Sequence, residues 1–157
     1  MFLNLSNIKT YIKSIAIPLL IGIVVGLLTS GSMTDFNLLV KPQFAPPAIL
    51  FPIVWTILYS LMGISYGILK TNDLVDEDVN STYYWQLFVN ALWSIIFFIL
   101  KWRLFAFFWI LLLIVLVVTM IIRFYNKNKL SGLLQLPYLL WLVFAAVLNL
   151  CIYTLNK

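Results

Sequence analysis

Charged residues divide this chain into five uncharged stretches, each long enough to cross a membrane. The chain has 157 residues, of which 10 are Lys or Arg and 5 are Asp or Glu. The stretches between the charges cover residues 14–34, 42–69, 79–100, 104–122 and 130–156. A membrane-spanning helix needs about 20 mostly apolar residues, and a charge at the bilayer centre costs at least about 2.5–3.5 kcal/mol. The charge pattern therefore predicts five transmembrane helices.

Composition agrees with the charge pattern. The chain is 64% hydrophobic and 10% charged, whereas soluble domains are about 45–50% apolar and about 25% charged. We therefore expect an all-α integral membrane protein, a five-transmembrane-helix bundle that forms one domain over residues 1–157. A loop over residues 30–46, shaped by its prolines, is expected after the first helix. The five helices are expected at residues 9–29, 47–69, 82–100, 104–124 and 131–155.

The first stretch has two interpretations. Lys9 and Lys13, the apolar residues after them and Ser30-Gly31-Ser32 loosely resemble a secretory signal. However, the stretch is long for a signal, and the pair Gly22-x3-Gly26 is typical of helix contacts in membranes. We favour a first helix that is retained in the protein.

Basic residues indicate an orientation for the bundle. With five spans the two termini lie on opposite sides of the membrane, and six basic residues fall on the N-terminal side against four on the other. Basic loops favour the cytoplasm, which places the N-terminus there. Short loops suit a bacterial cell (inner) membrane. The six residues are Lys9, Lys13, Lys70, Arg123, Lys127 and Lys129, and the four are Lys41, Lys101, Arg103 and Lys157.

Several classes of chemistry are excluded by residue type. The chain has no histidine and a single cysteine, Cys151, so it forms no intramolecular disulfide and has no Ser–His or Cys–His catalytic pair. We expect no metal site. The net charge of +5 is explained by basic loops, so we expect no nucleic-acid partner. The expected spans contain no Asp, Glu or His, which weakens the case for a proton-coupled transporter.

Three of the expected helices each carry a stripe of aromatic and amide side chains. Residues three or four positions apart share one helix face, and unpartnered amides are costly in lipid, so these faces should point inward. The stripes are Trp55, Tyr59, Met62 and Tyr66; Gln86, Asn90, Trp93 and Phe97; and Pro137, Trp141, Ala145 and Asn149.

The stripes have two interpretations. They fit ordinary helix–helix packing, in which amides join helices and Trp fills space. They also fit an aromatic pocket with a few hydrogen-bonding groups, which suits a flat hydrophobic ligand. Spacing alone favours packing.

Three motifs resemble those of the TspO/MBR family (tryptophan-rich sensory protein, translocator protein, peripheral benzodiazepine receptor). The total length and the long first loop also fit, and the resemblance is good over the second to fifth helices. The motifs are Leu39-x-Lys41-Pro42-x3-Pro46-Pro47 with Phe51-x2-Val54-Trp55-x2-Leu58-Tyr59-x2-Met62-Gly63; Asn90-x2-Trp93-Ser94-x2-Phe97-Phe98; and Pro137-Tyr138-x2-Trp141-x2-Phe144-Ala145-x2-Leu148-Asn149.

The resemblance implies a function and a set of ligands. It implies a five-helix bundle whose pocket binds porphyrins such as protoporphyrin IX and haem, and synthetic isoquinoline- or benzodiazepine-type ligands. Porphyrin or haem would be a ligand, with no obligatory cofactor. Lipids surround the bundle, and a homodimer is possible on the family pattern. The C-terminal pattern Val147-x5-Tyr153-x3-Lys157 fits a proposed cholesterol motif, but so do many membrane helix ends, and we do not expect cholesterol.

The resemblance also implies site residues. Trp55 and Asn90 would donate hydrogen bonds to a ligand carbonyl or carboxylate, while Trp141 and Ala145 would form the opposite wall. Tyr59 and Trp93 of the stripes join this set, and Phe44 and Pro46 belong to the loop that resembles a pocket lid. This sequence departs from the family at Asp35-Phe36 and at Phe44, where tryptophan or tyrosine is common, which puts ligand affinity at the lid in question.

Three functions follow from the resemblance. The first is a porphyrin-binding sensor or regulator of tetrapyrrole metabolism or stress. The second is light- and oxygen-dependent degradation of bound porphyrin, with Trp55 and Trp141 as the only catalytic candidates. The third is a transporter of porphyrin or another apolar metabolite, and the family's receptor and transport roles are expectations of the same kind. We rank binding first.

Overall fold

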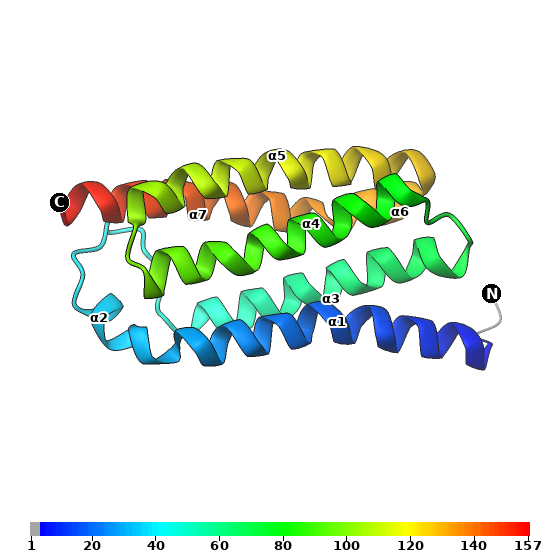
Figure 1. Ribbon diagram of the computed structural model, residues 1–157, viewed down its shortest axis with the longest axis horizontal. Coiled ribbons are helices and arrows are strands. Elements are labelled where there is room, and N and C mark those ends of the chain that lie inside the picture. Colours follow the sequence, from blue (N-terminus) through cyan, green and yellow to red (C-terminus); the bar gives the residue numbers. More distant parts are fainter. Residues whose placement is uncertain (1–3) are drawn as a thin grey trace.

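Five long helical segments run back and forth through the computed structural model, which describes residues 4–157 (Figure 1). Each segment is long and apolar enough to cross a membrane, which confirms the predicted all-α membrane bundle. In Figure 1 the first two segments lie side by side, and the last two lie across the bundle from them, with the third between the pairs. The segments are Leu5–Asn37, Leu50–Thr71, Glu77–Ile99, Arg103–Lys127 and Lys129–Leu155.

Different termini and connections lie at the two ends of the bundle. The N-terminus lies at one end, where α3 turns into α4 (Figure 1). The C-terminus lies at the other end, together with the short helix α2 and the connection that follows it. We call these the N-terminal end and the lid end. The lid is defined as residues 38–49, which connect α2 to α3.

The first segment extends further than the sequence predicts. Helix α1 spans Leu5–Thr29, and the 3-10 turn η1 (Ser30–Ser32) and helix α2 (Met33–Asn37) continue it. The prediction of one loop over residues 30–46 is therefore wrong for its first half. The Ser30 hydroxyl donates to the Leu27 carbonyl at 2.7 Å, and Thr29 donates to Val25 at 2.9 Å. Both hydroxyls thus bond to backbone carbonyls of the preceding helical turn. The chain therefore continues in a helical path through η1 and α2 and does not leave α1 as a loop.

The next two helices also differ from their predicted bounds. Helix α3 spans Leu50–Thr71 instead of 47–69, and α4 spans Glu77–Ser94 instead of beginning at residue 82. The Asp76 carboxylate caps α4 by accepting from the Val79 N–H at 2.9 Å. Glu77 and Asp78 follow in the first turn, where the helix dipole favours negative charge. The acidic run Asp76–Asp78, which the predicted bounds leave between two helices, thus starts the helix.

The second half of the bundle contains two irregular points. A π-helical turn, η2 (Ile95–Ile99), ends the third segment, and Lys101 takes a positive φ of 58° in the turn that follows. Helix α5 then spans Arg103–Lys127, three residues longer at its end than predicted. The last predicted helix, 131–155, is two helices, α6 (Lys129–Leu133) and α7 (Leu136–Leu155). Pro137 near the start of α7 lacks a backbone donor and so favours the break.

Glycine brings α1 and α3 together. A Cβ built on Gly63 would lie 2.3 Å from the Ile15 Cα atom, and one built on Gly67 would lie 2.6 Å from the Tyr11 ring. Gly22 of α1 faces the Tyr59 ring in the same way, at 2.6 Å. A Cβ on Gly26 would meet nothing within 4 Å. Three of these four glycines therefore serve packing within the chain.

Apolar side chains cover the outside of the bundle. Leu27 of α1, Phe108 and Val115 of α5 and Leu140 of α7 are each more than half exposed. Apolar surface on this scale is rare on soluble monomers, whereas lipid solvates it. The core lies between the helices and is filled by large aromatic and aliphatic side chains.

Candidate functional site

A chain of hydrogen-bonded polar side chains joins α3, α4 and α7 in the middle of the bundle. The Tyr59 hydroxyl donates to the Asn90 Oδ1 atom at 3.0 Å, and the Asn90 Nδ2 atom donates to the Tyr138 hydroxyl at 2.6 Å. Tyr138 in turn donates to the Gln86 Oε1 atom at 2.8 Å. All four side chains are buried. Both polar atoms of Asn90 are thus engaged with the protein itself.

Aromatic rings surround this polar chain. The Trp55 ring lies 5.4 Å from the Tyr59 ring and 6.2 Å from the Tyr138 ring, measured between centroids. One turn earlier on α3, Phe51 lies 5.8 Å from the Trp141 ring of α7. These separations are typical of favourable aromatic pairs. The structure therefore brings Trp55, Tyr59, Asn90 and Trp141 to one face shared by α3, α4 and α7.

Trp141 carries a polar atom that no protein group satisfies. Its indole Nε1 atom is buried, and it has no hydrogen-bond partner among the described residues. The ring itself packs against Phe51 and Phe144, at 5.8 and 5.3 Å. A buried donor without a partner costs about 1–3 kcal/mol. The indole N–H would therefore gain from a ligand acceptor or a water molecule.

The lid covers this aromatic face at the lid end. The Phe44 ring lies 6.1 Å from the Phe144 ring of α7, although Phe44 itself is half exposed. Two reciprocal hydrogen bonds attach the lid to the end of α7. The Val40 N–H donates to the Asn156 Oδ1 atom at 2.9 Å, and the Asn156 Nδ2 atom donates to the Val40 carbonyl at 2.8 Å. Pro46 is partly buried in the same connection.

Phe36 is one of the positions at which this sequence departs from the resembled family. It lies on α2, is buried, and packs edge-on against Phe51, Phe97 and Phe98 at 5.3–6.4 Å. The ammonium group of Lys41 lies 4.8 Å from the same ring. The Phe36 ring therefore packs α2 onto the aromatic face, and its contact with Lys41 joins the lid to the same ring. Asp35 beside it pairs with Lys101 at 2.7 Å.

Trp93 and Ala145 take up different positions from the other candidates. The Trp93 indole N–H donates to the Asn149 Oδ1 atom at 3.2 Å, and its ring stacks on Phe97 at 5.4 Å. The Asn149 Nδ2 atom donates to the Arg103 carbonyl at 2.8 Å, which ties α7 to the start of α5. Trp93 is thus already paired. Ala145 is buried on α7, one turn after Trp141.

Sequence reasoning predicted two stripes well and misjudged the third. Every member of the α4 stripe is buried, and so are three of the four members of the α3 stripe, while Trp55 is half-buried. On α7 the predicted member Pro137 is exposed, and its neighbour Tyr138 is buried instead. The spacing 138-141-145-149, of three, four and four residues, also places these residues on one helix face, so this signal was present in the sequence.

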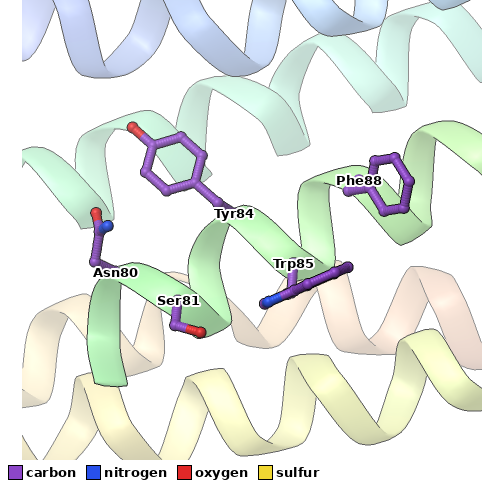
Figure 2. A pocket seen from close by; sticks show the side chains of 5 residues that line it. All are labelled: Asn80, Ser81, Tyr84, Trp85 and Phe88. Atoms are coloured by element: carbon purple, nitrogen blue, oxygen red, sulfur yellow. The ribbon is translucent and has the colours of Figure 1, made fainter. Parts of the chain in front are cut away.

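Two surface hollows lie away from these residues. One, of about 330 Å³, is on the outer face of α4 and is lined by Asn80, Ser81, Tyr84, Trp85 and Phe88 (Figure 2). Figure 2 shows the Tyr84 ring reaching toward α3, while Trp85 and Phe88 lie further along α4. The other, of about 470 Å³, is at the lid end and is lined by residues of the α4–α5 turn and the end of α7. Neither hollow contains Trp55, Asn90 or Trp141.

Comparison with known proteins gives one family. The model of the TspO/MBR family matches residues 14–155 of the chain. The chain is 41% identical over 152 residues to the tryptophan-rich protein TspO of Archaeoglobus fulgidus, covering 96% of this chain and 99% of the relative. It is 32% identical to the tryptophan-rich sensory protein of Cereibacter sphaeroides, with 74% of this chain and 73% of the relative covered. The human translocator protein is 33% identical, with 74% and 71% covered.

Proposed function

The chain belongs to the TspO/MBR family of membrane proteins, and from this premise we propose that it binds porphyrins between α3, α4 and α7. One observation carries the proposal, namely the unpaired, buried indole N–H of Trp141 within a group of aromatic rings. An aromatic surface with few hydrogen-bonding groups suits a flat, hydrophobic ligand with polar edges. A tetrapyrrole such as protoporphyrin IX has this character.

The ring of the porphyrin would pack on the aromatic side chains. Trp55 and Tyr59 form one wall and Trp141 with Phe144 forms the other, while Phe44 of the lid approaches Phe144 from outside. Ala145 adds a small side chain to the α7 wall and leaves room for the ligand beside Trp141. Stacking on these rings contributes affinity without any charged group. Rings of α3 and α7 already contact each other, Phe51 with Trp141 and Trp55 with Tyr138, so the ligand must separate such pairs to enter.

The two candidate hydrogen-bonding groups, Asn90 and Trp141, differ in whether they already have partners within the protein. Asn90 accepts from Tyr59 and uses one of its two amide N–H groups on Tyr138, so only its second N–H is left for a ligand carboxylate. The Trp141 N–H has no such partner to lose. We therefore assign the first contact with a ligand carbonyl or carboxylate to Trp141, and a later contact to Asn90.

We assign the binding a sensory or regulatory role in tetrapyrrole metabolism or stress. The Cereibacter sphaeroides relative is named as a sensory protein, and the candidate face holds neutral side chains that suit binding. Degradation of bound porphyrin in light stays a prediction for Trp55 and Trp141. Transport stays a prediction as well.

A titration in the dark tests the proposal. Detergent-purified protein is titrated with protoporphyrin IX, and tryptophan quenching is followed for the wild type and for Trp141→Phe. The phenyl ring preserves aromatic packing but removes the N–H group, so we expect affinity to fall by about tenfold, equivalent to about 1.4 kcal/mol. Trp85→Phe on the outer face of α4 is the matched control and should bind as the wild type does.

The same titration with haem separates stacking from metal ligation. The chain contains no histidine, so metal-free porphyrin should bind at least as tightly as haem. Binding that is unchanged in Trp141→Phe, or that weakens equally in Trp85→Phe, would contradict the proposed site.

We also propose a location for the protein. The N-terminal end carries six basic residues and the lid end four, so the N-terminus would face the cytoplasm of a bacterial inner membrane. The lid would then open on the opposite side. The test is a reporter enzyme that works only outside the cytoplasm, fused to the N-terminus. Activity of this reporter would contradict the proposed orientation.

A further inference from the structure

The hollow at the lid end gathers positive charge next to exposed aromatic rings. It measures about 470 Å³ and lies between the α4–α5 turn, the first turn of α5 and the end of α7. It is separate from the aromatic face proposed for porphyrin. Its lining residues are Lys101, Trp102, Arg103, Leu104, Phe105, Tyr153, Asn156 and Lys157.

Two of the three cations in this hollow form no salt bridge with any residue that the structure describes. Lys101 pairs with Asp35 at 2.7 Å, but Arg103 and Lys157 form no ion pair among the described residues. The Nε atom of Arg103 is buried without a hydrogen-bond partner, and its guanidinium lies 5.6 Å from the Phe97 ring. An arginine held in this way is well placed to bind a phosphate, because its planar fork matches two phosphate oxygens.

The start of α5 adds to the attraction for an anion. Arg103 is the first residue of this 25-residue helix. The free N–H groups of a first helical turn and the helix dipole both favour negative charge. The Asn156 side chain already bonds to Val40 and Ile152. We therefore assign it a place in the wall of the hollow and no hydrogen bond to the anion.

Apolar side chains continue from the hollow along the outside of α5. Phe105, Phe108 and Leu112 are 50%, 59% and 46% exposed, and their spacing places them on one helix face. Trp102 beside the cations is 59% exposed, as is typical of aromatic residues at the level of lipid headgroups. A ligand with a phosphate and a long apolar part fits both features, whereas a free phosphate uses only the first.

We propose that this hollow binds the phosphate of an anionic phospholipid, with its acyl chains lying along Phe105, Phe108 and Leu112. Arg103 and Lys157 hold the phosphate, and the first turn of α5 faces it. Basic pockets between membrane helices bind anionic headgroups in this manner. The site is independent of porphyrin binding.

Native mass spectrometry of the protein from bilayers tests the proposal. Full-length protein is reconstituted in equal amounts of phosphatidylglycerol and phosphatidylcholine, and the lipids that remain bound after extraction are counted. The wild type should retain phosphatidylglycerol preferentially, and Arg103→Gln/Lys157→Gln should reduce that preference by about tenfold. Lys157→Gln alone should give a smaller reduction, and it changes an exposed side chain that lies outside the helices.

A matched control and a competitor separate the alternatives. Lys9→Gln/Lys13→Gln removes two exposed cations at the N-terminal end and should leave the preference unchanged. An equal loss in both double variants, or an unchanged preference in the Arg103/Lys157 variant, would overturn the site. Millimolar inorganic phosphate should not displace the lipid. Full displacement would show that the hollow binds phosphate without needing the acyl chains, and would overturn the lipid assignment.

Discussion

At the scale of single residues, Asn90 determines how the interior of the bundle is held together. Its amide bonds to Tyr59 on α3 and to Tyr138 on α7, so one side chain of α4 links three helices. Replacing it by leucine keeps the volume similar but leaves both tyrosine hydroxyls with one partner fewer. Hydrogen bonds between membrane helices contribute about 0.6–2 kcal/mol each. We expect Asn90→Leu to lower the thermal unfolding temperature in detergent.

The double variant Tyr59→Phe/Asn90→Leu isolates one of these bonds. If the Tyr59–Asn90 bond contributes as described, the two substitutions together will cost less than the sum of the single costs. Additive costs would mean that the bond contributes nothing to stability.

At the scale of the helix, glycine sets the distance between α1 and α3. A methyl group on Gly63 would meet the backbone of Ile15 at 2.3 Å and the Ser14 carbonyl at 2.7 Å, and backbone atoms cannot move aside cheaply. Gly63→Ala should therefore separate the helices and cost about 1–3 kcal/mol of stability. Gly26→Ala, where a methyl group meets nothing within 4 Å, is the control. Equal unfolding temperatures for the two variants would show that the close contact is not important.

The ion pair at the start of α4 should make the stability of the fold depend on pH in the acidic range. The ammonium group of Lys127, 2.6 Å from Asp76, holds the pKa of the Asp76 carboxyl below its ordinary value of 3.8, and the Val79 N–H adds to the effect. A lowered pKa stabilises the fold above the ordinary value, and this contribution disappears as the pH falls through the lowered one. Asp76→Asn keeps the cap but loses the ion pair.

Unfolding temperatures measured between about pH 6 and pH 3 check this expectation. The advantage of the wild type over Asp76→Asn should be present at the upper end of this range and shrink below pH 3.8. A difference that stays constant down to pH 3 would rule out the ion pair as its cause.

The helices were easier to predict than their ends. Charge-free stretches require helices in lipid, because backbone groups have no other partners there, and all five spans were predicted. The acidic run Asp76–Asp78 was misassigned because capping residues are also common in loops. Helix α2 was missed because Ser30-Gly31-Ser32 resembles a break, while the hydroxyl of Ser30 bonds back to Leu27.

The candidate site was only partly predictable for a different reason. Helical spacing identifies which residues share a face, so Trp55, Tyr59 and Asn90 were found together. Spacing does not determine how one helix slides against another, and that register makes Tyr138 the partner of Asn90. The same register leaves the Trp141 N–H without a partner among the described residues, and it places the Trp93 N–H where it donates to Asn149.

At the scale of the whole molecule, the lid joins the first half of the bundle to the last helix. Its attachment is the reciprocal pair between Val40 and the Asn156 side chain, and α2 before it is tied to the α4–α5 turn by Asp35 and Lys101. Asn156→Ala removes both bonds to Val40. We expect amide exchange in residues 38–49 to become faster, because backbone groups that lose partners open more often.

Asn72→Ala at the end of α3 is the control for this experiment. Its side chain also bonds to a helix carbonyl, that of Ile68 at 2.7 Å, but it lies at the other end of the bundle. Exchange in the lid that responds equally to both variants would show that the Asn156 contact does not hold the lid.

The central claim is that α3, α4 and α7 open around a porphyrin, and a structure of the complex tests it most directly. In crystals or particles grown with protoporphyrin IX, the account predicts the ring between Trp55 and Trp141, beneath the lid. It also predicts that the Trp141 N–H donates to the ligand. A porphyrin found only on the outer surface, with the bonds from Tyr59 to Asn90 and from Asn90 to Tyr138 intact, would contradict the account.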